Sequence, residues 1–218
     1  MRIAEKIMYG FCKYSVLIIL GNFIVHLAVY NQNILNVIKY NSIKYYGFTA
    51  GIFILFYIIF RRSILFWETL GHEITHAVIG ALSLNKIISL IASERGGSVH
   101  YSGNGNLLVA LAPYTIPLAA LICGSLSLVL FYPVSIVFKH VTVIFFVWHF
   151  IALSHQFGEH QSDLHLYNYY YSTVFIVMIN IIHIVLIIFY LNGSTKLFFT
   201  LFITIINKWG HTWITLIS

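Results

Sequence analysis

The sequence predicts an all-α polytopic membrane protein, with about six to seven transmembrane or re-entrant helices and one small β-hairpin. Three observations lead to this fold class. The 218 residues are 60% hydrophobic and only 8% charged, whereas soluble domains carry about 25% charged residues. Mean hydropathy is +0.88, and the apolar residues gather in segments long enough to cross a bilayer. No linker or repeat divides the chain, so we expect one integral membrane domain over residues 1–218.

The expected helices follow from the apolar segments, because about 20 mostly apolar residues span the hydrocarbon core. In chain order the segments are Tyr14–Tyr30, Tyr46–Phe60, Ile64–Leu84, Asn106–Phe131, Val134–Ser154, Tyr170–Leu191 and Lys196–Ile217. The first segment follows a basic flank without a small-residue cleavage site, which favours an uncleaved helix over a secretory signal. The last carries its polar residues as one stripe, so it either spans the membrane, which we prefer, or lies in the interface.

The connection between the third and fourth segments, Asn85–Gly105, has a different pattern. Apolar and polar residues alternate on both sides of Glu94-Arg95-Gly96-Gly97. This pattern predicts a β-hairpin with a glycine turn, and an ordinary extramembrane loop is the alternative. Because an unpaired sheet edge cannot face lipid, a hairpin here must lie on the protein or line a cavity.

The distribution of charge and cysteine limits the classes of partner. The formal net charge of +6 comes mostly from short segments between apolar runs. Such a pattern fits anchoring at an anionic lipid surface, and it argues against nucleic-acid binding, which would need a long basic stripe. Cys12 and Cys123 lie far apart and predict neither a disulfide framework nor a cysteine zinc site.

The segment Ile64–Leu84 contains an HExxH motif, His72-Glu73-Ile74-Thr75-His76. Two histidines four residues apart lie about 40° apart around a helix, so both imidazoles can reach one Zn²⁺. Glu73 projects beside them, placed to take a proton from water activated by the metal and not to ligate the metal. Ionisable groups at membrane depth are costly, so their clustering predicts a functional site. The alternative is a chance match whose histidines bond to other helices.

A catalytic zinc needs a third protein ligand besides the two histidines. Asp163 is the only aspartate of the chain, and it stands at the approach to the segment Tyr170–Leu191. It is our first choice, with Ser162 as a plausible cap of the helix that Asp163 begins. The alternative role for Asp163 is that of a capping acid in a wet loop. Other residues of the same loop could ligate the metal instead, and these are His155, Glu159, His160 and His165.

Together these features resemble the site-2 protease family of intramembrane zinc metalloproteases. The features are HExxH on a buried helix, a glycine-containing hairpin, a helix with Pro113 and Pro117, and a distant aspartate that begins a later helix. The most similar members are compact bacterial ones with a Ser-Asp in place of a Leu-Asp-Gly ligand motif. The resemblance covers roughly residues 64–191, the expected catalytic core, and the missing Leu-Asp-Gly leaves the third ligand open.

The resemblance implies that His72, His76 and Asp163 bind Zn²⁺ and that Glu73 is the general base. It further implies hydrolysis of peptide bonds in a transmembrane protein or peptide substrate, by a multi-pass protein of the bacterial inner membrane. Two other functions stay open, a catalytically silent zinc-binding membrane scaffold and a small transporter. Glu68, one turn before His72, either orients that histidine or pairs with Arg61 or Arg62.

Overall fold

The structure is a computed structural model, and the residues it describes are 14–25, 28, 40–103, 105–158, 161–193, 196, 199–200, 202–204 and 207. The chain groups into two compact units, one of Met1–Tyr40 with Val177–Ser218 and the other of Asn41–Ile176. The second unit contains every residue of the candidate site. The expectation of a single domain over the whole chain stays a prediction.

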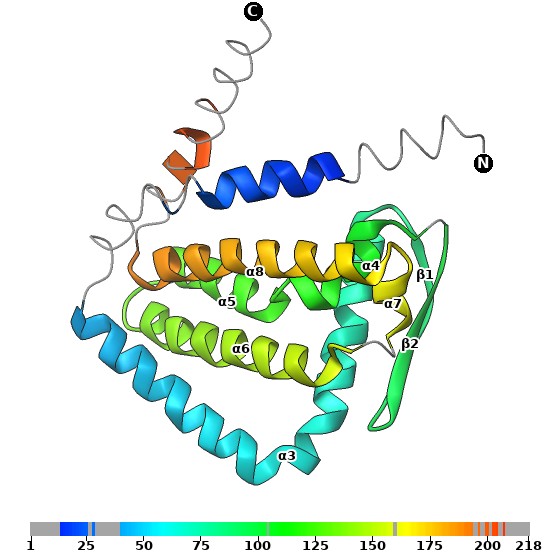
Figure 1. The fold of residues 1–218 in the computed structure, drawn as a ribbon. Helices are drawn as coiled ribbons and strands as arrows, with labels where there is room; N and C mark the ends of the chain where they lie inside the picture. The colour runs from blue at the N-terminus through cyan, green and yellow to red at the C-terminus, as the bar shows by residue number, and fades with distance from the viewer. Residues whose placement is uncertain are drawn as a thin grey trace, which may run out of the picture. The chain divides into compact units, whose positions relative to one another are not determined.

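The longest element is α3 (Tyr40–Leu82), a helix of 43 residues with a kink at Phe60. A straight helix of this length would measure about 65 Å, roughly twice the thickness of the hydrocarbon core. The kink instead gives two arms, which meet at the bend of α3 in Figure 1. Directly after it come Arg61 and Arg62, which separate two of the expected apolar segments. Those two expected helices are therefore the arms of one bent helix.

The first arm of α3 carries an exposed apolar stripe. Phe48, Ile52, Leu55 and Ile59 are all more than half exposed, with Ile59 at 73%. Their spacing of four, three and four residues places them on one face of the helix. A contiguous apolar face of this kind suits contact with lipid acyl chains.

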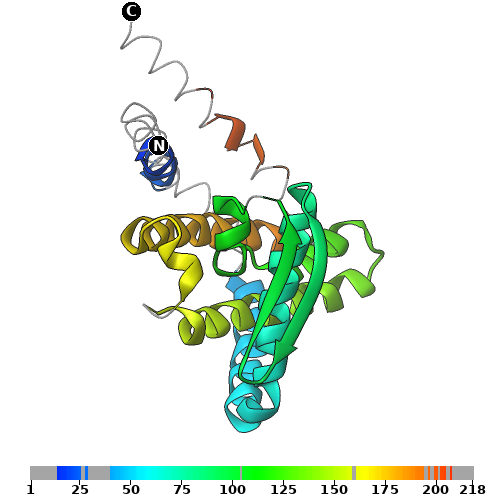
Figure 2. The same cartoon turned by 90° about the vertical axis from the view of Figure 1, so that its right-hand side faces the viewer.

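The expected hairpin is confirmed. Strands β1 (Lys86–Ser93) and β2 (Gly96–Ser102) pair antiparallel from Lys86↔Ser102 to Ser93↔Gly96, with an irregularity between Ile87 and Ser89. Gly96 has φ +140°, a conformation that side chains disfavour, so glycine suits the end of this tight turn. The Ile87 side chain packs over Gly80 of α3, and both views show the hairpin beside the second arm of α3 (Figures 1 and 2).

After the hairpin come α4 (Leu107–Thr115), α5 (Leu118–Val129), α6 (Val134–Gln156), α7 (Ser162–His165) and α8 (Tyr169–Leu191). Helices α4 and α5 meet at an angle of 73°. A short connection joins α5 to α6, and these two helices pack against each other, while α7 contacts α4. The α4–α7 contact is part of the core, because Leu111 and Leu164 are fully buried there.

Three described helices are long and apolar enough to cross a membrane, and they suggest a membrane protein: Lys44–Leu82 within α3, α6 and α8. The bent α4–α5 pair makes a fourth crossing if it is a single broken span. This number is lower than the expected six to seven. Two expected spans merge in α3, and the first expected segment contains a shorter apolar helix, Tyr14–Val25. Most of the segment 196–217 lies outside the described residues.

Candidate metal centre

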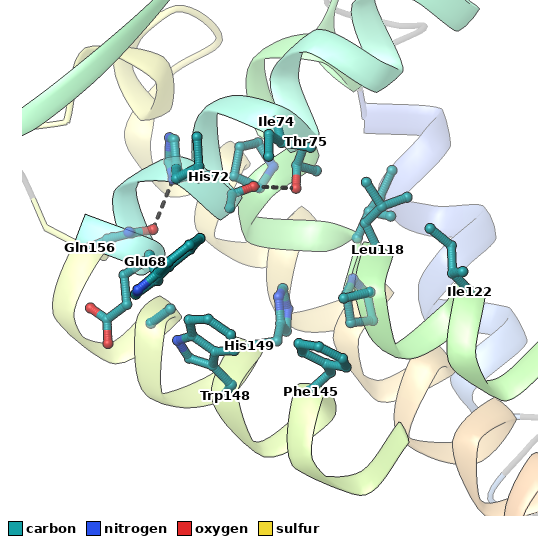
Figure 3. A pocket seen from close by; sticks show the side chains of 18 residues that line it. Glu68, His72, Ile74, Thr75, Leu118, Ile122, Phe145, Trp148, His149 and Gln156 are labelled. Atoms are coloured by element: carbon teal, nitrogen blue, oxygen red, sulfur yellow. Dashed lines mark hydrogen bonds between the residues drawn. The ribbon is translucent and has the colours of Figure 1, made fainter. Parts of the chain in front are cut away.

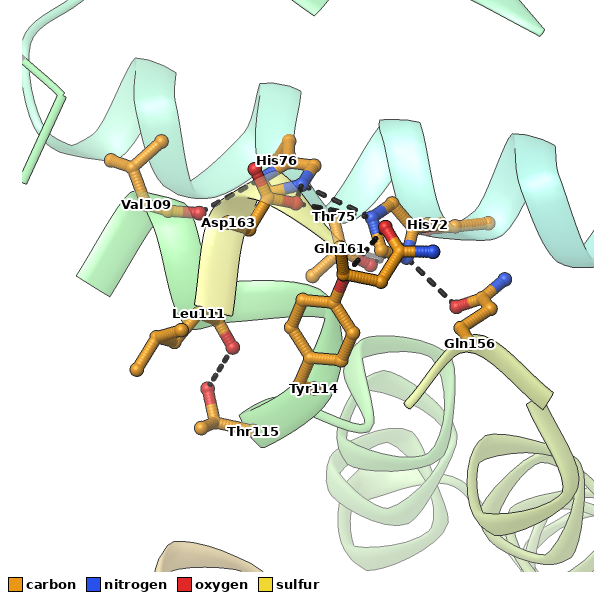
Figure 4. Close-up of polar contacts among 11 residues, drawn as sticks. His72, Thr75, His76, Val109, Leu111, Tyr114, Thr115, Gln156, Gln161 and Asp163 are labelled. Atoms are coloured by element: carbon orange, nitrogen blue, oxygen red, sulfur yellow. Dashed lines mark hydrogen bonds and ion pairs between the residues drawn. The ribbon is translucent and has the colours of Figure 1, made fainter. Parts of the chain in front are cut away.

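The second arm of α3 and the short helix α7 bring three metal-ligating side chains together. His72 and His76 lie one helical turn apart, and their Nε2 atoms are 3.2 Å from each other. Asp163 Oδ2 lies 3.3 Å from Nε2 of His76 and 3.8 Å from Nε2 of His72. Figure 4 shows the three side chains converging. This group could hold a metal ion, and its members are the three residues that the sequence suggests as metal ligands.

The spacing of the three atoms agrees with a small tetrahedral site. Zinc–nitrogen and zinc–oxygen bonds measure about 2.0–2.2 Å, so neighbouring ligand atoms in a tetrahedral site lie about 3.3–3.6 Å apart. The distances between the three candidate atoms run from 3.2 to 3.8 Å.

Hydrogen bonds on the far side of each imidazole orient the two histidines. Nδ1 of His72 lies 2.8 Å from the amide oxygen of Gln156, and Nδ1 of His76 lies 2.8 Å from the carbonyl oxygen of Val109 (Figures 3 and 4). Both oxygens can only accept, so each Nδ1 donates and each neutral Nε2 presents a lone pair toward Asp163. Three acceptor atoms that converge in this way require a shared cation or proton. Such donation from the outer nitrogen is typical of metal-ligating histidine.

A proline explains why the Val109 carbonyl is available to His76. In a helix, this carbonyl would accept the N–H of the residue four positions later, which is Pro113. Proline has no N–H, so the Val109 oxygen has no such intrahelical donor. The oxygen accepts the hydrogen bond of His76 instead.

Helix α7 is only four residues long and is held by its neighbours. Leu164 is fully buried, and its carbonyl accepts a hydrogen bond of 2.9 Å from the Ser172 hydroxyl. The Tyr114 hydroxyl donates to the side-chain oxygen of Gln161 at 3.3 Å. Gln161 occupies the N-cap position without a capping side-chain bond, so the expected cap by Ser162 was wrong. Tertiary contacts, and not a local cap, position α7 and with it Asp163.

The Asp163 carboxylate is stabilised in its charged form. Burial by itself raises the pKa of this group. In the absence of a metal, His72 and His76 oppose that effect when they are protonated at Nε2, because they then donate hydrogen bonds to the carboxylate and hold its pKa well below the usual range. Asp163 is therefore anionic at neutral pH, which is the state that a metal ligand requires.

Glu73 is buried beside the three ligands, at 6% exposure. A Cβ atom on Gly97 of β2 would lie 2.6 Å from Glu73 Cγ and 2.8 Å from its Oε1. It would also lie 2.7 Å from the backbone oxygen of Ile91. Only glycine leaves room for this close approach. The hairpin backbone thus packs directly on the Glu73 side chain.

The other residues considered for the site have different positions. His155 Nδ1 lies 3.5 Å from Glu68 Oε2 and 3.1 Å from the Tyr57 hydroxyl, and that hydroxyl donates to Glu68 Oε1 at 2.5 Å. Glu68 is buried and belongs to this separate cluster, and Gln156 takes the role of orienting His72. The His165 ring stacks on Tyr169 at 5.7 Å. Glu159 and His160 lie outside the described residues.

Sequence reasoning missed four contributors to this site. Gln156 and the Val109 carbonyl orient the histidines, Gly97 contacts Glu73, and the buried ring of Tyr114 packs edge-on to His72 at 5.2 Å. The Val109 carbonyl could have been found, because a proline four residues later removes its helical donor. The sequence holds no comparable signal for Tyr114.

Comparisons with protein-family models, with curated proteins and with solved structures found no match to this chain.

Proposed function

We propose that this protein is an intramembrane zinc metalloprotease similar to the site-2 proteases, and that it acts in the bacterial inner membrane. The observation that carries the proposal is the convergence of the HExxH histidines with Asp163, which lies 87 residues further along the chain. The motif by itself gives two ligands and a base. A carboxylate at the remaining position completes the three-ligand set of a catalytic zinc site.

The residues have distinct roles in the proposed reaction. His72, His76 and Asp163 hold the zinc ion, which when bound supplies a more acidic water and polarises the substrate carbonyl. Glu73 accepts a proton from the water as its oxygen attacks the carbonyl carbon of the peptide bond. The same carboxylate then passes the proton to the amide nitrogen as the carbon–nitrogen bond breaks. Contact with Gly97 holds the Glu73 side chain in place for both transfers.

The proposed substrate is a transmembrane protein or peptide. A membrane helix hides its carbonyls in its own hydrogen bonds, so it must unwind locally before hydrolysis. Each strand of the β1–β2 hairpin pairs only with the other strand within the described chain, which leaves a free edge on each. An unwound substrate segment could add to one of these edges and regain its backbone hydrogen bonds. Because β2 packs on Glu73, a substrate segment paired with this hairpin would lie close to the Glu73 carboxylate.

The test is cleavage of a membrane-spanning peptide by the purified full-length protein in lipid vesicles. We expect cuts within or beside the apolar stretch, mapped by mass spectrometry, and faster cleavage where glycine, proline or asparagine loosens the helix. A zinc chelator should stop cleavage, and added zinc should restore it. An unchanged cleavage rate in the presence of the chelator would contradict a zinc-dependent reaction.

The main rival is a membrane protein that binds zinc without catalysing a reaction. That protein would hold zinc in the same three residues but cleave no spanning substrate. The transporter alternative predicts paired, internally similar halves, which the sequence does not show.

A further inference from the structure

A cavity of about 350 Å³ adjoins the metal centre on one side of α3. It is lined by residues of α3, the bent α4–α5 pair and α6 (Figure 3). Its lining includes His72 of the metal centre, together with the neighbouring α3 residues Gly71 and Thr75. The other walls are mostly apolar, and they include Trp67, Leu118, Ile122, Phe145 and Trp148.

The positions around α3 place the metal centre between this cavity and the hairpin. At about 100° per residue, Gly71 and Thr75 lie roughly 100° and 60° to one side of His72. Glu73 lies about 100° to the other side, where Gly97 of β2 contacts it. A peptide that passes the metal centre from the hairpin therefore meets the cavity next.

We propose that this cavity binds the side chain of the substrate residue beside the scissile bond, and that it selects a bulky apolar side chain such as leucine, methionine or phenylalanine. This inference rests on the proposed function and extends it to the substrate sequence.

Three polar side chains that line the cavity already have hydrogen-bond partners, and a fourth, His149, packs edge-on to Phe150 at 5.6 Å. The Glu68 carboxylate is bonded to Tyr57 and His155. Gln156 is bonded to His72, and the Thr75 hydroxyl donates to the carbonyl of Gly71 at 2.8 Å. A cationic or acidic side chain would lose its hydration here and find no free counter-charge among these groups, at a cost of several kcal/mol. An apolar side chain would gain from burial against the aromatic wall.

The size of the cavity also fits one side chain with its adjoining backbone. Its volume is near the lower end of the range of about 300–1,000 Å³ for ligand pockets. A helix with its side chains is about 10–12 Å across and would not fit. The cavity thus suits a substrate that has already unwound.

Gly71 offers a way to fill the cavity without disturbing the helix. A Cβ atom at this position would meet no atom within 4 Å. Gly51, on the first arm of α3, has equally open surroundings and does not line the cavity. Gly71→Leu and Gly51→Leu are therefore a matched pair, since both add the same side chain to the same helix.

The experiment uses the full-length protein in vesicles and spanning peptides that differ only in the two residues flanking the mapped cut. At one of these positions, wild type should prefer leucine or phenylalanine over alanine and lysine by about tenfold or more in kcat/KM. Gly71→Leu should lose this preference, because its side chain fills the cavity, so that the ratio of kcat/KM between the leucine and alanine peptides falls close to one. Gly51→Leu should keep the wild-type preference.

A second readout does not depend on turnover. A photoactivatable leucine at the same flanking position should crosslink Glu73→Gln protein at Trp67, Ile122 or Phe145. The inference would be overturned if Gly71→Leu kept the wild-type preference, or if it cleaved every peptide more slowly by the same factor. Either result would leave the proposed function standing. Absence of any cleavage by wild type would overturn the proposed function and the inference with it.

Discussion

Asp163 closes the candidate metal centre, because its carboxylate lies within 3.8 Å of both histidine Nε2 atoms. Asp163→Asn replaces a charged ligand by a neutral amide of the same shape. Changes to groups that only orient a metal ligand typically lower metal affinity by about 10–100-fold. We expect the loss of zinc affinity in Asp163→Asn to be larger, because Asp163 is itself a proposed ligand. Zinc content and competition with a chelator measure this loss.

The histidines near Asp163 provide the controls. His155→Ala and His165→Ala should retain zinc, because His155 contacts Glu68 and Tyr57 and His165 stacks on Tyr169. His160→Ala should also retain zinc, as the sequence predicts. Full zinc content in Asp163→Asn, together with its loss in His160→Ala, would transfer the role of third ligand to His160.

Gln156 acts on the metal centre through His72. Gln156→Leu removes the acceptor of the His72 Nδ1 proton and frees the ring to turn. Zinc affinity should fall by about 10–100-fold. Gln156→Glu keeps an acceptor at a similar position and should bind zinc more tightly than Gln156→Leu. Equal affinity in the two variants would show that the hydrogen bond does not orient His72.

At the scale of elements, the contact between β2 and α3 depends on one glycine. Gly97→Ala would place a Cβ within 2.7 Å of the Ile91 backbone oxygen and against the Glu73 side chain. Because a backbone atom cannot rotate away, the strand or Glu73 must shift, at a cost of about 1–3 kcal/mol in the free energy of unfolding. We expect cleavage to fall at least tenfold while zinc content stays at the wild-type level.

Gly51→Ala is the control for this change, since its Cβ meets no neighbouring atom. It should leave both cleavage and the unfolding temperature close to wild type. Wild-type cleavage by Gly97→Ala would mean that the hairpin contact does not hold the base in position.

The local elements of the site were predictable from the sequence because their patterns are local. The spacing of His72 and His76 and the alternation around Glu94–Gly97 each depend on a few neighbouring residues, and the structure has the helix and the hairpin there. The partners of the histidines were not predictable in the same way. Gln156 reaches His72 only because the end of α6 packs near α3, 84 residues away in the chain.

At the scale of the whole molecule, hydropathy predicted the membrane class, but the described residues contain fewer candidate crossings than expected. Apolar segments separated by Arg61 and Arg62 look like two helices, yet they form one helix that bends at Phe60. The segment 106–131 looks like one helix, yet it breaks at Ile116 and Pro117, where α4 and α5 meet at 73°, while Pro113 lies inside α4. Hydropathy shows which segments are apolar. Whether the helix continues or bends between them depends on tertiary packing, which hydropathy does not describe.

The central claim is that Glu73 is the base of a zinc-dependent peptide hydrolysis in the membrane. The most direct measurement compares wild type with Glu73→Gln for zinc content and for cleavage of the same spanning peptide in vesicles. We predict one zinc per chain in both proteins and loss of cleavage in Glu73→Gln by at least a hundredfold, because only the proton acceptor is removed. Cleavage at the wild-type rate by the zinc-loaded variant would contradict the account.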